Sequence, residues 1–306
     1  MRGYTKKNLF KFFAMALNSS VFKTRSLTAA IFVIVMLAGL LWDRWSFFIL
    51  FSIIHFGCWI EYQKIVGLID KRYAGISPFH KYGVMIAGWC MMFYFTNDAY
   101  VIGGVSLHDV GWWAGLAFLF ILPVGEIIVS RKMDAKNILY SALGLVYISL
   151  SVGLLTNIRS LFYGGFDFYL SEILVLMLIG SIWINDTMAY IVGSLIGRTP
   201  FSKISPKKTW EGTLGGIALA IVIMGVIGYL LKGKFDWDPV PQWMIIAAIA
   251  SVAGTFGDLL ESKLKRMAGV KDSGQIMPGH GGFLDRFDSL LVATPFVWLY
   301  VWWLVR

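Results

Sequence analysis

Long apolar stretches separated by short polar loops run through the whole sequence. A helix needs about 20 predominantly apolar residues to cross the roughly 30 Å of bilayer hydrocarbon. Stretches of this kind lie near residues 27–42, 45–60, 82–95, 112–129, 138–155, 170–196, 212–231, 242–260 and 289–305. The pattern therefore predicts an all-α integral membrane protein, a polytopic bundle of about nine transmembrane helices.

The distribution of basic residues orients this bundle. Cytoplasmic loops of membrane proteins hold an excess of Lys and Arg. With the N-terminus in the cytoplasm, 22 of the 27 basic residues fall on the inner side, and the other five are Arg44, Arg159, Lys232, Lys234 and Arg306. We therefore expect an integral protein of the cell (inner) membrane, with the N-terminus cytoplasmic and the C-terminus outside.

The composition agrees with a membrane protein and excludes several other classes. Hydrophobic residues make up 58% of the chain and charged residues only 15%, whereas a soluble domain carries about 25% charged residues. The net charge of +9 follows the topology and is not gathered on an aromatic and basic platform, so we expect no nucleic-acid binding. Helix packing without chemistry is predicted for Cys58, Cys90, Gly193, Gly197, Gly254 and Gly257.

The loops divide the chain into three regions. Residues 1–26 form a basic arm, in which Leu9, Phe10, Phe13 and Leu17 share one face of a predicted interfacial helix; a frayed tail is the alternative. Residues 27–170 hold spans one to five. Residues 171–306 are expected to form the catalytic membrane region, with cytoplasmic loops at 197–212 and 261–288.

Carboxylates cluster where spans eight and nine meet the cytoplasm. Asp258 lies near the end of span eight, and Asp285 and Asp288 open span nine, so all three lie on the same side of the membrane. Asp258 with Ser262, and Asp285 with Asp288, have the spacing of one helical face. These hard oxygen ligands suit Mg²⁺. Simple ion pairs, such as Asp285 with Arg286, are the alternative reading.

Basic and hydroxyl side chains crowd the same cytoplasmic loops. They are Ser205, Lys207, Lys208 and Thr209 after span six, and Lys265, Arg266 and Lys271 after span eight. The stretch 278–282 reads PGHGG, in which Gly281 and Gly282 allow an anion-binding backbone and His280 can donate to a phosphate. Together with the carboxylates, these groups predict a site for a polyphosphate bound as its metal complex.

Residues 262–288, SKLKRMAGVKDSGQIMPGHGGFLDRFD, resemble the signature of the phosphatidate cytidylyltransferase (CDP-diacylglycerol synthase) family. NDTMAY from Asn185, SPKKTWEG at 205–212 and Asp258 in GDLLES resemble the same family, and only Met277 replaces a more usual apolar residue. The resemblance covers roughly residues 180–290. It implies transfer of CMP from CTP to phosphatidic acid, giving CDP-diacylglycerol and pyrophosphate for phospholipid biosynthesis. Mg²⁺ and, in part of the family, K⁺ as a second ion are the implied cofactors.

The chemistry and the resemblance together assign roles to individual residues. Because the lipid phosphate is itself an anionic nucleophile, catalysis reduces to positioning and charge neutralisation. We expect metal binding by Asp258, Asp285, Asp288 and Ser262, with Lys265 and Arg266 completing the catalytic set. Substrate contacts are expected from Asp186, Ser205, Lys207, Lys208, Thr209, Lys271, His280, Gly281, Gly282 and Arg286. The expected partners are CTP, phosphatidic acid entering laterally, the lipids of the inner leaflet and a second copy of the chain in a homodimer.

Three other functions compete with this reading. A CDP-alcohol phosphotransferase would need a DxxDG sequence, but Ser289 follows Asp288 where Gly is required. A cytidylyltransferase for another lipid phosphate would use the same headgroup chemistry. A polytopic transporter of phosphorylated solutes would favour midplane polar residues such as Asn185 and Asp186, although most of the polar residues lie on one membrane face.

Overall fold

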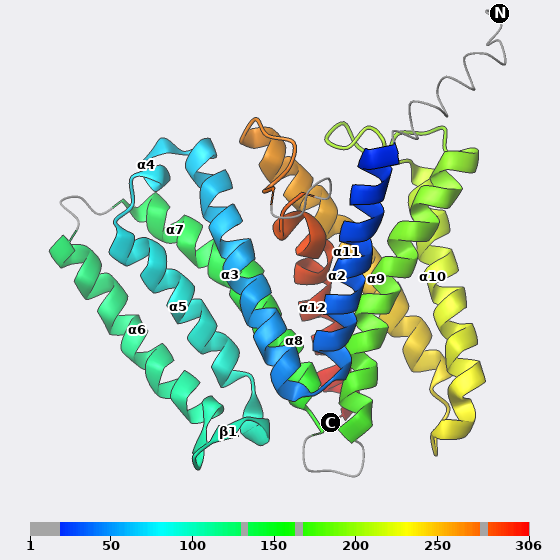
Figure 1. Cartoon of the computed structure of the whole chain (residues 1–306), viewed down its shortest axis with the longest axis horizontal. Helices are drawn as coiled ribbons and strands as arrows, with labels where there is room; N and C mark the ends of the chain where they lie inside the picture. Colours follow the sequence, from blue (N-terminus) through cyan, green and yellow to red (C-terminus); the bar gives the residue numbers. More distant parts are fainter. Residues whose placement is uncertain (1–18, 130–133, 163–167, 276–280, 306) are drawn as a thin grey trace, which may run out of the picture.

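The computed structural model describes residues 19–129, 134–162, 168–275 and 281–305, and nearly all of them are helical (Figure 1). The first half contains α2 (Ser19–Leu41), α3 (Arg44–Ile69), α4 (Lys71–Ala74), α5 (Pro78–Tyr94), α6 (Leu107–Val129), α7 (Ala135–Gly144) and α8 (Ser151–Ser160). The second half contains α9 (Phe168–Ile196), α10 (Trp210–Leu231), α11 (Val240–Met267) and α12 (Leu284–Val305). A π-helix, Leu145–Leu150, joins α7 to α8, and the short strands β1 (Val101–Ile102) and β2 (Val105–Ser106) form a hairpin.

The helices form the predicted polytopic arrangement. To within one residue, every predicted apolar stretch is helical, with 138–155 running through α7, the π-helix and α8, and successive long helices run in opposite directions (Figure 1). In the described ranges, seven helices are long and apolar enough to cross a membrane, with α7 to α8 counted as one. The apolar part of α2, Leu27–Leu41, and the 17-residue α5 are shorter. Helix α2 begins at Ser19, inside the predicted arm, whereas Leu9, Phe10, Phe13 and Leu17 lie outside the described residues.

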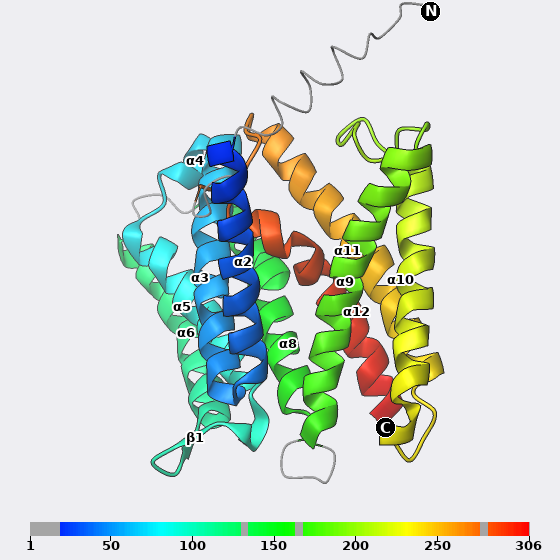
Figure 2. The same ribbon diagram turned by 45° about the vertical axis from the view of Figure 1, so that its right-hand side comes forward.

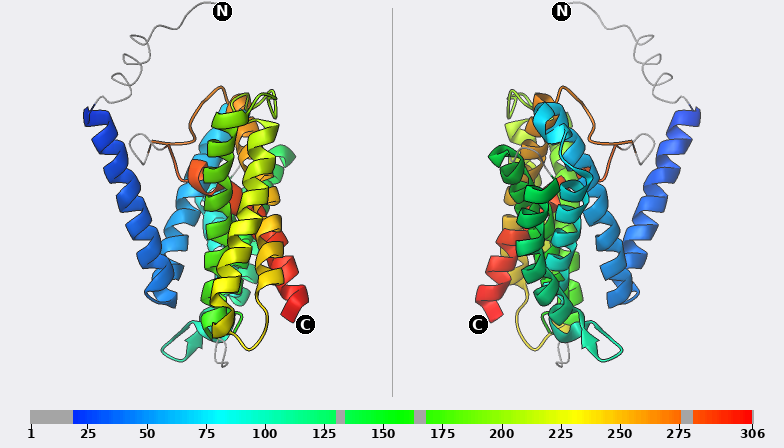
Figure 3. Two further views of the ribbon diagram at one scale, coloured as in Figure 1. Left: turned by 90° about the vertical axis from the view of Figure 1, so that its right-hand side faces the viewer. Right: turned by 90° about the vertical axis from the view of Figure 1, so that its left-hand side faces the viewer.

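The two ends of the bundle differ. The α9–α10 and α11–α12 connections lie at the upper end in Figure 1, and the β1–β2 hairpin lies at the lower end. Figure 2 shows α9 and α10 side by side, with the loop that joins them above. Figure 3 shows α2 leaning away from the other helices toward the upper end.

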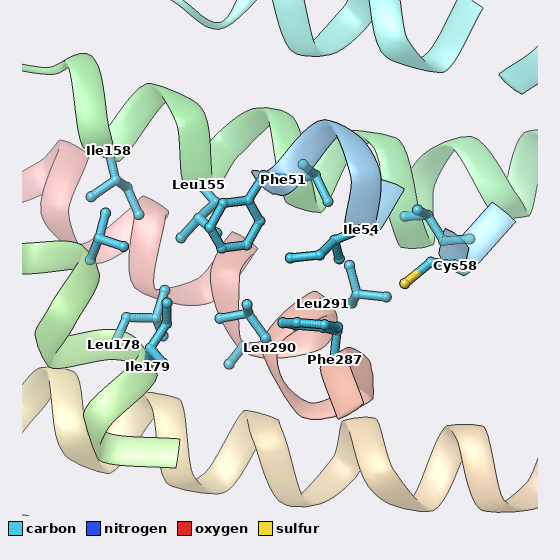
Figure 4. Close-up of a cluster of buried hydrophobic side chains, with 14 of the residues drawn as sticks. Phe51, Ile54, Cys58, Leu155, Ile158, Leu178, Ile179, Phe287, Leu290 and Leu291 are labelled. Atoms are coloured by element: carbon cyan, nitrogen blue, oxygen red, sulfur yellow. The ribbon is translucent and has the colours of Figure 1, made fainter. Parts of the chain in front are cut away.

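One buried core joins the two halves of the chain. Figure 4 shows its centre, which consists of Phe51, Ile54 and Cys58 of α3, Leu155 and Ile158 of α8, Leu178 and Ile179 of α9, and Phe287, Leu290 and Leu291 of α12. In a membrane, such packing and not the hydrophobic effect holds helices together. The core therefore crosses the predicted boundary at residue 170 and fixes the start of α12 against α3.

Glycines allow the closest helix contacts. A Cβ at Gly216 of α10 would lie 2.7 Å from the Cβ of Ala189 and 2.8 Å from the carbonyl oxygen of Asn185, both in α9. A Cβ at Gly257 of α11 would lie 2.4 Å from the carbonyl oxygen of Asp288 in α12. The predicted packing role of Gly257 agrees with this contact, which brings Asp258 beside the first turns of α12.

We expect Gly216→Ile to lower the free energy of unfolding by about 1–3 kcal/mol, because overpacking forces α9 and α10 apart. Thermal unfolding of the detergent-solubilised protein measures the change. Gly180→Ile in α9 is the matched control, because a Cβ at Gly180 meets nothing within 4 Å. Equal melting temperatures for the two variants would contradict the close α9–α10 contact.

Candidate functional site

A hairpin-shaped loop over residues 197–209 carries one group of predicted site residues. The amide of Phe201 donates to the carbonyl of Lys208 at 2.8 Å, and the amide of Trp210 donates to that of Thr199 at 2.9 Å. Glu211 accepts from the amide of Thr199 at 3.2 Å and from its hydroxyl at 2.8 Å. Thr209 caps α10 by accepting from the amide of Gly212 at 3.1 Å. These hydrogen bonds give the loop a defined conformation, which fixes the positions of the lysines it carries.

A cavity of about 470 Å³, here called the hairpin cavity, lies between this loop and the helices beside it. Its polar lining combines Lys207, Lys208, Thr209, Ser194, Thr213, Asn185, Asp186, Thr255 and Asp258. Tyr190, which is 77% exposed, also lines it. Cations and hydroxyl donors around one opening are the groups that bind phosphates.

A second cavity of about 320 Å³, here called the carboxylate cavity, adjoins the first. It is lined by Phe32, Trp183, Asp186, Asp258, Glu261, Lys265, Asp285, Arg286, Asp288 and Ser289. Asp186 and Asp258 line both cavities. Their carboxylates therefore lie where the two cavities meet: the hairpin cavity adds two lysines to them, and the carboxylate cavity adds three further acids and two bases.

Ion pairs connect the hairpin and the helix ends. Lys208 pairs with Asp258, whose other oxygen accepts from the hydroxyl of Ser262 at 3.2 Å. Lys265 pairs with Glu261 on its own helix and with Asp285 on α12, the latter at 2.6 Å. The predicted proximity of Asp258 and Ser262 agrees with these contacts. The alternative reading, that the acids form ion pairs with nearby bases, agrees with these contacts, in which Asp285 pairs with Lys265.

The carboxylates differ in their hydrogen bonds and in their burial. Asp285 is bonded at both oxygens, because its Oδ1 binds Lys265 and its Oδ2 accepts from the amides of Ser273 and Gly282, both at 2.8 Å. Asp288 is 8% exposed, and the charges of Asp186 and Asp258 act on it. Asp285 is thus held by the protein at both oxygens, whereas Asp186 and Asp258 line both cavities and Asp288 is buried beside the carboxylate cavity.

Two carboxylates of the protein itself lie against the glycine-rich turn. Gly281 has a φ of +84°, and a Cβ there would lie 2.5 Å from Oδ2 of Asp285. A Cβ at Gly282 would lie 2.2 Å from Oε1 of Glu61, which reaches this turn from α3. The amide of Gly282 therefore serves Asp285 in this structure, and the phosphate nest predicted for it stays a prediction.

Several predicted residues stand apart from the two cavities. Arg266 and Lys271 are exposed and line neither cavity, and Arg266 donates to the carbonyl of Val270 at 3.4 Å. Ser205 lies in the hairpin, where its carbonyl accepts from the amide of Lys208 at 3.1 Å. His280 lies outside the described residues. Most of the other predicted residues line one of the two cavities, while Ser262, Gly281 and Gly282 line neither and contact Asp258 or Asp285 instead.

The donor set fits a magnesium ion that is shared with substrate phosphates. Within the parts of the chain that are described, no group of three His, Cys, Asp or Glu converges closely enough to hold a metal alone. Mg²⁺, however, is usually bound by one or two carboxylates together with waters and substrate phosphates, and not by an all-protein cage. Asp186 and Asp258, at the boundary of a cavity lined by lysines, offer such a partial set.

Sequence reasoning missed several residues of the site. Glu61 and Ser273 bond to the turn before α12, and Phe32 comes from α2, far from the recognised motifs. A signal for Glu61 was present, since it is a lone acid directly after the apolar stretch 45–60, and an ionisable residue within or at the end of a span is a functional hypothesis by default. Nothing in the sequence pattern distinguishes Phe32 from the other aromatic residues of the spans.

Comparison with known proteins identifies relatives along nearly the whole chain. The model of the cytidylyltransferase family matches residues 23–304. A phosphatidate cytidylyltransferase of Staphylococcus saprophyticus is 31% identical over 276 residues, which cover 89% of this chain and 96% of that protein. One of Bacillus subtilis is 35% identical over 198 residues, 64% and 68% of the two chains, and one of Synechocystis is 46% identical over 124 residues, 39% and 40%. The similarity is thus wider than residues 180–290.

Proposed function

The chain belongs to the cytidylyltransferase family, and we infer that it converts CTP and phosphatidic acid into CDP-diacylglycerol and pyrophosphate for phospholipid biosynthesis. The observation that carries this inference is the similarity to a phosphatidate cytidylyltransferase over 96% of that protein's length. It makes the chain a nucleotidyltransferase embedded in a membrane. The two adjoining cavities supply a physical account of how two phosphate-bearing substrates could meet.

The proposed reaction is a direct displacement at the α-phosphorus of CTP. A phosphate oxygen of phosphatidic acid forms the new bond to this phosphorus, and the bond to the oxygen bridging the α- and β-phosphates breaks, releasing pyrophosphate. No serine or cysteine nucleophile is needed, because the attacking oxygen is already anionic. The protein then contributes orientation and compensation of charge.

The residues of the hairpin cavity suit the triphosphate. Lys207 and Lys208 would neutralise its phosphates, and Thr209 and Ser194 would donate hydrogen bonds. Asp258 would keep Lys208 directed toward the boundary with the carboxylate cavity. On the other side of that boundary, Lys265 and Arg286 would attract the lipid phosphate.

Mg²⁺ is the cofactor we propose, with Asp258 and Asp186 as its nearest protein ligands and Asp288 and Ser262 beside them. When bound, it would neutralise charge on the triphosphate and on the leaving pyrophosphate. Asp285 would support the site through its ion pair with Lys265, because it lines only the carboxylate cavity and not the hairpin cavity proposed for the triphosphate. K⁺ as a second ion remains part of the proposal, by resemblance to the family.

We propose that the upper end in Figure 1 is cytoplasmic and that the chain crosses the inner membrane nine times, with α2 and α5 as spans. The excess of basic residues on that side supports this orientation. Phe32 and Trp183 line the carboxylate cavity, and α2 leans away from the bundle there (Figure 3), so lipid would enter laterally beside α2. A homodimer is compatible with this arrangement.

The test is an assay of detergent-purified protein with labelled CTP, Mg²⁺ and phosphatidic acid in mixed micelles. We expect CDP-diacylglycerol and pyrophosphate in equal amounts. Product with a polyprenyl phosphate but not with phosphatidic acid would reassign the lipid substrate. Absence of any product from folded protein supplied with Mg²⁺ and K⁺ would contradict the enzymatic function and favour transport.

Removal of divalent metal should lower the rate at least roughly hundredfold, since metal ions contribute several kcal/mol of charge stabilisation in such transfers. The measurement is the initial rate in EDTA and after addition of excess Mg²⁺. Restoration of the rate by Mg²⁺ is the control for irreversible damage. Full activity in EDTA would contradict a metal-dependent reaction.

A further inference from the structure

Glu61 is a buried carboxylate that the proposed reaction does not use. It lies in α3, inside a candidate membrane span, and only 3% of the residue is exposed. It lines neither the hairpin cavity nor the carboxylate cavity. A carboxylate in such a position is costly unless several donors stabilise it.

Two backbone amides at the start of α12 donate to Glu61. The amide of Phe283 donates to Oε1 at 2.9 Å, and the amide of Leu284 donates to Oε2 at 2.8 Å. Because α12 begins at Leu284, these are amides of the helix start, which have no partner within the helix. Glu61 therefore acts as an N-terminal cap supplied by another helix, where a negative charge is also favoured by the helix dipole.

Ser273 links Glu61 to Asp285. Its hydroxyl lies 2.6 Å from Oε2 of Glu61 and 2.9 Å from Oδ2 of Asp285, while its amide donates to that same Oδ2 at 2.8 Å. A hydroxyl has one proton to donate. Since Oδ2 already accepts from two amides, the hydroxyl is best used by Glu61. The chain of contacts then runs from Glu61 through Ser273 and Asp285 to Lys265.

The backbone around Glu61 is shaped to receive it. A Cβ at Gly274 would lie 2.1 Å from Oε1 of Glu61, and one at Gly282 would lie 2.2 Å from it. One helical turn earlier in α3, a Cβ at Gly57 would lie 2.2 Å from the ring of Phe283. Both sides of the contact thus have glycine at the points of closest approach, so that α3 and the turn lie tightly against each other.

We propose that Glu61 is a positioning residue of the catalytic site: it fixes the turn at 281–284 so that Asp285 holds Lys265 at the carboxylate cavity. Glu61 contacts no substrate and acts through Ser273, Asp285 and Lys265. The N-terminal half, which carries none of the recognised motifs, thereby controls the geometry of the site. The kinetic part of this inference rests on the proposed function.

The test compares Glu61→Gln with Gln63→Met. Glu61→Gln keeps the shape but turns an NH₂ group toward a backbone amide, so the turn loses an acceptor. Gln63 is also buried in α3, and its side chain donates to the carbonyl of Lys81, so Gln63→Met removes a hydrogen bond remote from the site. We expect kcat to fall roughly ten- to hundredfold in Glu61→Gln, with KM for CTP little changed, because misplacement by about 1 Å can cost that much. Gln63→Met should change stability but not kcat.

Hydrogen exchange provides a readout that does not depend on turnover. The amides of Phe283 and Leu284 should exchange roughly tenfold faster in Glu61→Gln and at the wild-type rate in Gln63→Met. Ser273→Ala is a milder second variant, and its effect on kcat should not add to that of Glu61→Gln, because the two residues act as one unit.

Wild-type kcat and wild-type exchange in Glu61→Gln would overturn the inference. An equal fall of kcat in Gln63→Met would also overturn it, since the effect would then be general destabilisation. If Glu61→Gln does not fold, wild-type kcat together with wild-type exchange of the Phe283 and Leu284 amides in Ser273→Ala would decide against the proposed link. A wild-type protein without turnover would refute the proposed function, whereas the exchange experiment would still test whether Glu61 holds the turn at 281–284.

Discussion

Asp258→Asn is expected to lower kcat roughly 10³-fold while the protein stays folded. Asp258 lines both cavities and pairs with Lys208, so it acts where the two substrates would meet. An asparagine of the same shape preserves the packing but removes the negative charge that holds Lys208 and, in our proposal, Mg²⁺. The side chains of Lys208 and Asp258 are 29% and 30% exposed, so this pair contributes about 1 kcal/mol or less to stability. That is too little to explain a 10³-fold loss, which corresponds to about 4 kcal/mol.

The measurement is the rate of CDP-diacylglycerol formation at saturating CTP and phosphatidic acid, together with the melting temperature. Asp236→Asn, an exposed acid in the loop between α10 and α11, is the matched control and should behave as wild type. A kcat for Asp258→Asn close to the wild-type value would show that Asp258 has no catalytic role. A melting temperature well below the wild-type value, together with the loss of activity, would instead indicate a structural role.

Apolar patterning predicted the helices well where both ends of a helix are apolar. The stretch 170–196 corresponds to α9, Phe168–Ile196. The predicted stretch 289–305 missed the start of α12, because this helix begins at Leu284 and its first turn is polar. That turn is helical because Glu61 caps it from α3. Hydropathy along one segment contains no information about a cap that comes from a residue more than 200 positions away.

The site was predictable in its chemistry and less so in its pairings. Helical spacing correctly placed Ser262 against Asp258, because that relation is local. The pairing of Lys208 with Asp258 depends on the fold of the 197–209 loop, in which Glu211 binds the hydroxyl of Thr199. Likewise, Asp285 pairs with Lys265 because α11 and α12 cross closely at Gly257. Pairings between elements require the packing of those elements.

Lys265→Met is expected to lower the free energy of unfolding by about 3–5 kcal/mol and to reduce turnover at least hundredfold. Lys265 bonds to Glu261 and Asp285, whose side chains are 1% and 10% exposed. Both carboxylates would lose their shared cation in a poorly hydrated place, and removing one partner of a buried ion pair is far more costly than removing an exposed one. The loss of Lys265 also removes the cation that would attract the lipid phosphate in the carboxylate cavity.

Lys263→Met is the matched control for this change, because Lys263 is exposed and lies two residues earlier in the same helix. Its melting temperature and turnover should stay near the wild-type values. The double variant Lys265→Met with Glu261→Gln should regain part of the lost stability, since only Asp285 then lacks the cation, but it should regain no turnover. Equal stability of Lys265→Met and Lys263→Met would contradict the buried ion pairs. Recovery of turnover in the double variant would show that Lys265 only balances Glu261 and has no part in handling the lipid phosphate.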